Sequence, residues 1–243
     1  MARIARRPAR KSASKPSPSS AAGNAATPGS DHDKIVAAFL ALLAEERFER
    51  IGFAEIADRA GVPLAQMRGA FPSTLAILAA YLKSVDRAVL GGDMADMAEE
   101  PARERLFDVL MRRLEVMAPH REAVRSLLRS ATRNPPLGLA LNGLAVRSQQ
   151  WMLTAAGIKA AGPRGMMRAQ GLAVLFASVL RVWVKDDDAG LARTMAALDR
   201  ALGRGQRFAG LLDDLCRVPS RLCRLRSRWR RRDPDAEEES AAA

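Results

Sequence analysis

The stretch Phe53-Ala-Glu-Ile-Ala-Asp-Arg-Ala-Gly-Val-Pro-Leu-Ala-Gln-Met-Arg-Gly-Ala-Phe71 predicts two short helices joined by a tight turn. Ile56 and Ala60 lie on one face of the first helix, which suits packing against neighbouring helices. Gly61 is expected to end that helix, because glycine takes the left-handed conformation without the steric cost of a Cβ. Pro63 is expected to open the second helix, where its fixed φ is favourable. The pattern is that of a helix-turn-helix, whose second helix can lie in the major groove of DNA.

Three apolar residues are expected to hold the turn and the second helix onto the protein: Val62, Met67 and Phe71. Met67 and Phe71 are four positions apart, so they lie on one side of the helix. The opposite side then faces solvent and carries only two polar side chains, Gln66 and Arg68. We predict a DNA-contact surface made of these two residues and their neighbours: Gln66, Arg68, Arg59, Leu64, Ala65, Gly69 and Thr74.

The same stretch resembles the TetR family of transcriptional regulators. Ile56-Ala57-x-x-Ala60-Gly61-Val62 is similar to the second helix and turn of that family, and residues 33–48 are similar to its first helix. Phe71-Pro72-Ser73, with Leu75, Ile77 and Leu78, is similar to its following helix junction. The resemblance covers residues 33–90. It implies a homodimer that binds double-stranded DNA through two helix-turn-helix units and responds to a small apolar ligand.

The sequence departs from the TetR family at the positions expected to touch DNA. Gly52 stands where the family has a small hydroxyl residue as helix cap, and Pro63 where it has a serine. Arg68 replaces a tyrosine, Ala70 replaces an aromatic residue or histidine, and Thr74 replaces a lysine that holds a phosphate. Phosphate contacts supply affinity and base contacts supply sequence choice, so both sets are small here. A TetR-like fold whose DNA-contact helix has lost its function is therefore an alternative.

Length and composition favour an all-α protein: 243 residues, rich in Ala, Leu and Met, without the alternating pattern of a strand. We expect a TetR-like fold with a three-helix head and a C-terminal helical bundle. The predicted divisions are a disordered basic tail (1–30), the helix-turn-helix domain (31–90), a ligand-binding and dimerisation domain (93–205), a basic amphipathic helix (206–232) and an acidic disordered tail (233–243). Two long helices, at about 166–185 and 188–202, are expected to form the homodimer interface, because the first is apolar nearly all round.

The net charge of +12 is concentrated near the ends of the sequence. Residues 1–30 carry six Lys/Arg and no acid, and residues 217–232 carry eight arginines and no acid. Such segments attract nucleic acid or an anionic membrane. For 206–232 we expect a peripheral membrane contact, with a solvated extension that folds on the acidic tail as the alternative. The N-terminus has no apolar signal segment and the two cysteines form no metal pattern, which favours a cytoplasmic location.

The second half of the chain resembles a different family, the ubiquinone-biosynthesis accessory proteins that share the TetR fold and bind lipid. The resemblance lies in five segments: 106–110, 118–125, Trp151 with 155–157, Trp183 before 186–188, and Thr194 with 198–200. It implies a lipid-binding protein of quinone synthesis that is not an enzyme. Candidate ligand contacts are Trp151, Met152, Met167, Phe176 and Trp183, although Met and Trp on long helices are more often core residues.

The sequence contains no catalytic constellation. His32 is expected in the tail, and His120 has no Ser or Cys partner nearby in the sequence, so a structural role is favoured for each. The acidic residues are dispersed and no glycine-rich phosphate loop follows a strand. We therefore expect no enzyme activity, no metal and no cofactor.

Overall fold

The computed structural model describes residues 28–92 and 99–205, and all of the regular elements in these ranges are helices. The predicted all-α fold is confirmed for them. The disordered tail was predicted to extend to residue 30, but residues 28–30 begin the first helix. The rest of that prediction, for 1–27, and the predictions for 206–232 and 233–243 lie outside the described residues.

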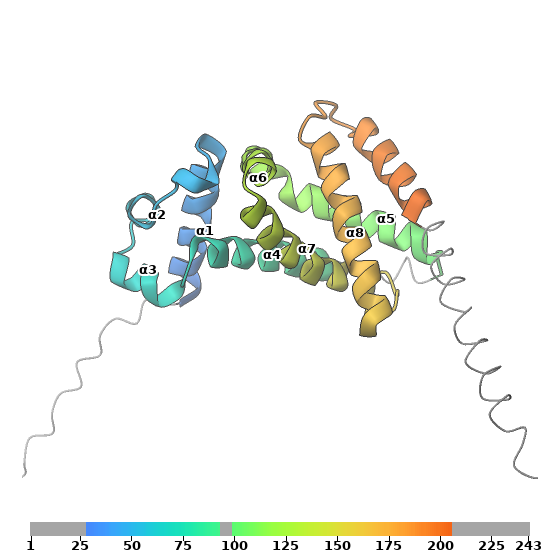
Figure 1. The fold of residues 1–243 in the computed structure, drawn as a ribbon, viewed down its shortest axis with the longest axis horizontal. Coiled ribbons are helices and arrows are strands. Elements are labelled where there is room, and N and C mark those ends of the chain that lie inside the picture. The colour runs from blue at the N-terminus through green and yellow to red at the C-terminus, as the bar shows by residue number, and fades with distance from the viewer. Residues whose placement is uncertain (1–27, 93–98, 206–243) are drawn as a thin grey trace, which may run out of the picture.

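The first helices form a unit that we call the head, at the left in Figure 1: α1 (Pro28–Glu45), the short 3-10 helix η1 (Phe48–Arg50), α2 (Phe53–Ala60) and α3 (Leu64–Ala70). The first helix was expected to reach Phe48, but it ends at Glu45. Phe48 still packs against the core, with its ring edge-on to Phe39 at 6.2 Å between centroids. His32 lies on α1 rather than in the tail, because its ring is held 4.3 Å from that of Phe71.

α4 (Thr74–Leu90) runs from the head into the rest of the molecule, which we call the body. Ser73 caps α4 as predicted, since its hydroxyl accepts a hydrogen bond from the backbone N–H of Ala76 at 3.1 Å. The helix ends at Leu90, with Gly91 as its C-cap. A domain boundary at this point stays a prediction. One cluster of buried apolar residues includes residues of both the head and the body.

The body contains α5 (Ala102–Met117), η3 (Ala118–His120), α6 (Arg121–Arg133), α7 (Pro135–Ala155), α8 (Gly162–Trp183) and a helix over 192–205. The pair Gly162-Pro163 was expected to break the chain between helices. It forms the start of α8 instead, because the first turn of a helix has no use for the backbone N–H that proline lacks. Among the described helices α8 is long and apolar enough to cross a bilayer, yet seven of its residues are buried in the core.

Helix α6 contacts both the head and the turn after α8. It packs closely on α1, and the hydroxyl of Ser126 donates a hydrogen bond of 2.6 Å to the carbonyl of Glu46. At its first residue, Arg121 donates to the carbonyl of Asp186 at 2.8 Å, and its guanidinium lies 5.0 Å from the ring of Trp183. Arg125, next to Ser126, donates to the carbonyl of Val184 at 3.1 Å. A shift of the turn after α8 would therefore reach α1 through one rigid helix.

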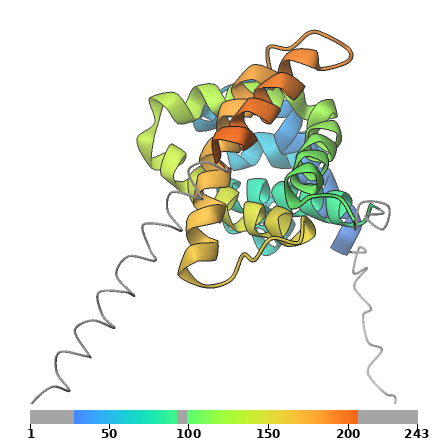
Figure 2. The same ribbon diagram turned by 90° about the vertical axis from the view of Figure 1, so that its right-hand side faces the viewer.

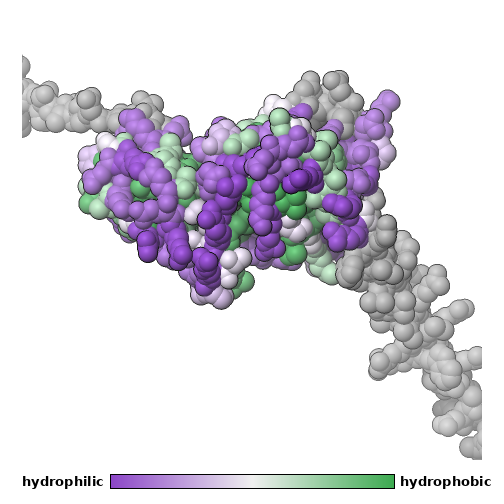
Figure 3. Space-filling view, turned by 90° about the horizontal axis from the view of Figure 1, so that it is seen from above, coloured by the Kyte–Doolittle hydropathy of each residue, from purple (hydrophilic) through white to green (hydrophobic). Residues whose placement is uncertain are grey.

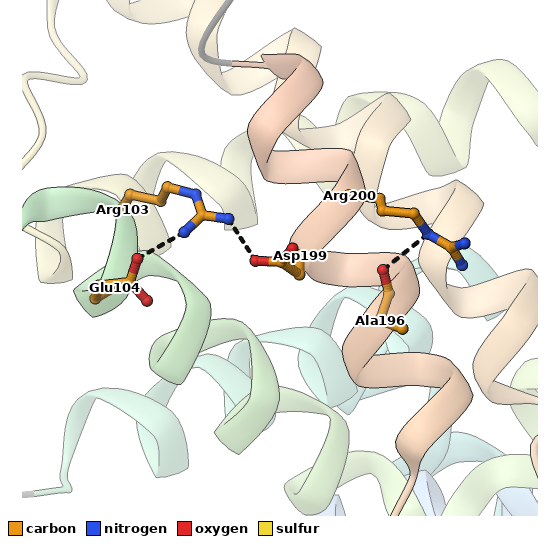
Figure 4. Close-up of polar contacts among 5 residues, drawn as sticks. All are labelled: Arg103, Glu104, Ala196, Asp199 and Arg200. Atoms are coloured by element: carbon orange, nitrogen blue, oxygen red, sulfur yellow. Dashed lines mark hydrogen bonds and ion pairs between the residues drawn. The ribbon is translucent and has the colours of Figure 1, made fainter.

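The helix over 192–205 lies beside α8 in both ribbon views (Figures 1 and 2). Its start is capped as predicted. Asp186 accepts hydrogen bonds from the backbone N–H (2.8 Å) and the hydroxyl (2.6 Å) of Thr194, which lower the pKa of this aspartate, and Asp188 accepts from the N–H of Ala192 at 3.1 Å. Arg103 of α5 bonds to Asp199 and to Glu104, so it anchors the middle of this helix to α5 (Figure 4).

Candidate nucleic-acid interface

The turn between α2 and α3 has the geometry that the sequence predicts. Gly61 adopts the left-handed conformation, with φ of 64° and ψ of 35°. The N–H of Val62 bonds back to the carbonyl of Ala57 at 3.0 Å, and the Val62 side chain is buried in the turn. Pro63 precedes α3 as its N-cap, one position earlier than expected. Met67 and Phe71 are buried, so α3 is held by one side and exposes the other.

The start of α2 is held in a way that the sequence reading missed. Gly52 has no side chain with which to cap the helix, but its backbone N–H donates to the carboxylate of Glu55 at 3.2 Å. This is the reciprocal half of a capping box, in which a glutamate at the third helical position satisfies the N-cap N–H. The signal was present in the sequence as the glutamate three residues after Gly52. The departure from the TetR pattern at Gly52 therefore leaves α2 partly capped.

Five of the seven predicted DNA-contact residues belong to α3, whereas Arg59 lies on α2 and Thr74 on α4. Exposed side chains or backbone are found at Leu64, Ala65, Gln66, Arg68, Gly69 and Arg59, and Thr74 at the first position of α4 is half-buried. The structure thus brings the α3 residues together on one face. It also engages two of the four polar members of the set, Gln66 and Arg59, with other residues of the protein.

Gln66 is already hydrogen-bonded within the head. Its side-chain amide donates to the carboxylate of Asp31 on α1, and Lys34 contacts the same carboxylate at 3.1 Å. Because Asp31 and Gln66 are 35 positions apart, no local pattern predicts this contact. The contact directs the amide nitrogen of Gln66 towards α1.

Arg59 is paired with Glu45 at the end of α1. Two hydrogen bonds, of 3.0 and 2.7 Å, join the guanidinium to the two carboxylate oxygens. This hydrogen bonding raises the pKa of Arg59 and lowers that of Glu45. Both side chains are exposed, so solvent screening makes the pair weak. The pair nevertheless directs Arg59 towards α1 in the structure.

Arg68 is the remaining cation of the predicted set. It is exposed on α3 and makes no hydrogen bond or ion pair with other described residues. Its guanidinium is the group on this face best suited to a bidentate contact with a guanine edge or a phosphate. The chemistry available on α3 is therefore one free arginine, one engaged amide and a small apolar surface.

The five predicted ligand contacts do not converge on one space among the described residues. Trp151 and Met167 are exposed by 58% and 52%, on α7 and α8. Met152, Phe176 and Trp183 are buried in the core. Their role in ligand binding stays a prediction.

The interior of the body contains polar groups that the sequence did not indicate. Asp86 of α4 accepts hydrogen bonds from Arg113 of α5 at 2.5 Å and from the hydroxyl of Ser148 of α7 at 2.6 Å. The guanidinium of Arg113 also lies 5.6 Å from the ring centre of Phe176. Three further buried polar atoms have no hydrogen-bond partner within the described ranges: the Nε of Arg113, the side-chain oxygen of Gln149 and the hydroxyl of Tyr81. A buried ion pair thus ties three helices together at the centre of the body.

Tyr81 provides a test of this interior through pH. Burial raises its pKa to about 12, so the folded protein keeps the phenol proton that the unfolded chain loses near pH 10. Stability from this group is complete below pH 10 and falls as the pH rises to 12, by about 2–3 kcal/mol. We expect Tyr81→Phe to remove that extra loss, which urea unfolding at pH 8, 10 and 11.5 would measure.

Wild type and Tyr81→Phe are compared at each pH. The difference between their stabilities therefore excludes the effect of the lysines and cysteines that both contain. Tyr81 is the chain's only tyrosine, so tyrosinate absorbance reports its ionisation directly. Equal losses of stability in wild type and Tyr81→Phe, or a phenol that titrates near pH 10 in the folded protein, would contradict the buried environment.

His120 packs beside Tyr81. Its ring stands edge-on to that of Tyr81 at 5.4 Å between centroids, and burial lowers its pKa. Among the described residues no group of His, Cys, Asp and Glu side chains could hold a metal ion.

Comparison with known structures finds proteins of similar fold. The structure is similar to that of a TetR transcriptional regulator from Nitrosomonas europaea ATCC 19718, with a TM-score of 0.57, 22% identity and coverage of 72% of this chain and 97% of that one. It is also similar to a TetR transcriptional regulator from Rhodococcus sp. RHA1, with a TM-score of 0.53, 20% identity and coverage of 73% and 96%. No family model and no curated protein matches the sequence. The predicted TetR-like fold is confirmed; the resemblance of the second half to the ubiquinone accessory proteins is not.

Proposed function

We propose that this protein is a DNA-binding transcriptional regulator that places α3 in the major groove. The observation that carries the proposal is the α2–turn–α3 unit, in which Gly61 sets the turn, Met67 anchors α3 and Arg68 stays free on the exposed side. Structural neighbours that are TetR regulators support it. A helix held by one face and exposed on the other is what insertion into a groove requires.

The DNA contacts proposed for α3 are few, so we expect the affinity for DNA to depend mainly on sequence-independent charge. Arg68 supplies the charged base or phosphate contact, while Leu64, Ala65 and Gly69 supply a small surface that fits closely against the groove. Gln66 and Arg59 contribute after they leave Asp31 and Glu45. Affinity then depends on non-specific charge, for which the six Lys/Arg of residues 1–30 are a source, and binding should weaken steeply with salt.

The test is Arg68→Ala in the full chain. We expect its affinity for a DNA fragment selected from genomic DNA to fall about fivefold or more, since a lost charged contact costs about 1 kcal/mol or more. Arg147→Ala is the matched control, because Arg147 is exposed on α7 and belongs to the body. Fluorescence anisotropy at fixed salt measures both. A selection that returns no enriched palindrome would refute the regulator proposal.

The proposed regulator is a homodimer, as a palindromic site requires. Its interface is formed by α8 and the helix over 192–205, where large apolar side chains remain exposed in the single chain: Met166, Met167, Val174 and Met195. Met167, Gly171, Val174 and Ser178 recur on one exposed stripe of α8 at spacings of four and three. A second copy would cover this stripe.

The proposed effector is a small, mainly apolar molecule that acts within the body. α6 supports such a response, because Ser126 bonds to the residue after α1, while Arg121 and Arg125 bond to the end of α8 and the turn after it. A ligand that moves this turn relative to α4 would alter the spacing of two heads and thus the affinity for DNA. We expect a cytoplasmic protein without enzyme activity.

A lipid-binding accessory role in quinone synthesis is the second candidate. The observation that favours it is the engagement of Gln66 and Arg59, which leaves α3 with a single free cation. Mass spectrometry of the protein purified without added ligand separates the two candidates. A co-purified DNA fragment supports the regulator, and a co-purified isoprenoid lipid supports the accessory role.

A further inference from the structure

A basic hollow lies where the head meets the body. It has a volume of about 380 Å³ and is lined by residues of η1 and its N-cap and of the corner between α6 and α7: Arg47, Glu49, Arg50, Ser130, Arg133, Asn134 and Pro135. We propose that this hollow binds a small polyanion that carries phosphate or carboxylate groups. The site is separate from α3 and from the five residues predicted to contact an apolar ligand.

The wall of the hollow is fixed by hydrogen bonds between head and body. The side-chain amide of Asn134 donates to Glu49 at 3.2 Å, and its oxygen accepts from the N–H of Leu137 at 3.1 Å as the cap of α7. The hydroxyl of Ser130, which is buried, accepts from the N–H of Phe48 at 3.3 Å. Three of the groups that shape the hollow are therefore held in place before any ligand arrives.

The charge of the hollow is strongly positive. Its three arginines, Arg47, Arg50 and Arg133, are exposed, and none donates a side-chain hydrogen bond to another described residue. The one carboxylate among the lining residues is that of Glu49, whose pKa is lowered by hydrogen bonds from its own backbone, Asn134 and Ser130 and by the charge of Arg47. Guanidinium groups bind phosphate and carboxylate through paired hydrogen bonds, so three of them around one concave surface favour an anion with several acceptors.

The position of the hollow favours a small molecule over DNA. Asp31 and His32, at the beginning of α1, contact α3, whereas Arg47 and Arg50 follow the end of the same helix (Figure 1). An 18-residue helix is about 27 Å long, so the hollow and α3 lie at opposite ends of α1. Seen from above, the surface over the head and the neighbouring part of the body is mostly hydrophilic (Figure 3). Small-molecule sites are common at such junctions, and their usual volumes include this one.

A ligand in this hollow would hold the head to the body. Two arginines belong to the segment around η1 and the third ends α6, so one anion bound by all three adds a link between them. The bound anion stabilises this arrangement of head and body against any other.

The experiment measures binding of inorganic pyrophosphate and of citrate to the full chain by isothermal titration calorimetry. We expect Arg133→Gln to weaken binding at least tenfold, and Glu49→Gln to strengthen it several-fold, because glutamine keeps an acceptor for Asn134 without the opposing charge. Arg147→Gln removes the same charge from the exposed surface of α7 and should leave binding unchanged. Preference for pyrophosphate or for citrate identifies a phosphate or a carboxylate ligand.

Two results would overturn the proposal. Equal affinity of wild type, Arg133→Gln and Arg147→Gln would assign the anion to the basic terminal segments. Loss of DNA affinity in Arg133→Gln, with pyrophosphate binding intact, would make these arginines contacts for the DNA backbone. The calorimetry contains no DNA, so its outcome is independent of whether α3 binds an operator.

Discussion

Replacing Asp86 with alanine is expected to lower the free energy of unfolding by about 3–5 kcal/mol, as breaking a buried ion pair does in other proteins. The substitution leaves the guanidinium of Arg113, which is 3% exposed, without its carboxylate partner. It also removes the acceptor of the Ser148 hydroxyl. Urea unfolding followed by circular dichroism measures the loss.

The double variant Asp86→Leu with Arg113→Met is the informative control. Replacing both partners by apolar residues removes the buried charges together, and such exchanges are often neutral or stabilising. We expect the double variant to recover most of the stability that Asp86→Ala loses. A free energy of unfolding of Asp86→Ala within about 1 kcal/mol of the wild-type value would contradict a buried ion pair at this position.

A charge in the exposed stripe of α8 is expected to dissociate the proposed homodimer. Val174 is 60% exposed in the single chain, and a second copy on this stripe would bury it. Val174→Asp then places an unpaired carboxylate on both sides of a two-fold interface. At about 2 kcal/mol for each copy, the dimer dissociation constant rises on the order of a thousandfold. Sedimentation velocity at micromolar concentration measures the change.

Leu64→Asp is the matched control for the dimer experiment. Leu64 is 55% exposed, similar to Val174, but it lies on α3 in the head. We expect this variant to remain dimeric and to lose DNA affinity. A wild-type protein that sediments as a monomer, or a dimer that survives Val174→Asp, would show that α8 does not form the interface.

The helix-turn-helix could be predicted from the sequence because its determinants are local. The left-handed Gly61, the buried Val62 and the four-residue spacing of Met67 and Phe71 each depend on a few neighbouring positions. The same holds for Ser73 as the cap of α4 and for Asp188 before the last described helix. The predicted helix ends differ from the observed ones by several positions, as at Glu45 and Gly162. Helix ends also depend on what the adjoining turn packs against, which a local pattern does not show.

The sequence by itself determined the helices, their buried faces and the exposed side of α3. Only the tertiary structure decided which polar groups meet a partner. Gln66 meets Asp31 across 35 positions, Arg59 meets Glu45 across 14, and Arg113 meets Asp86 across 27. Arg47, Arg50 and Arg133 likewise line one hollow because α6 packs along α1. Periodicity fixes the face on which a residue lies, whereas the packing register between distant helices fixes what that face meets.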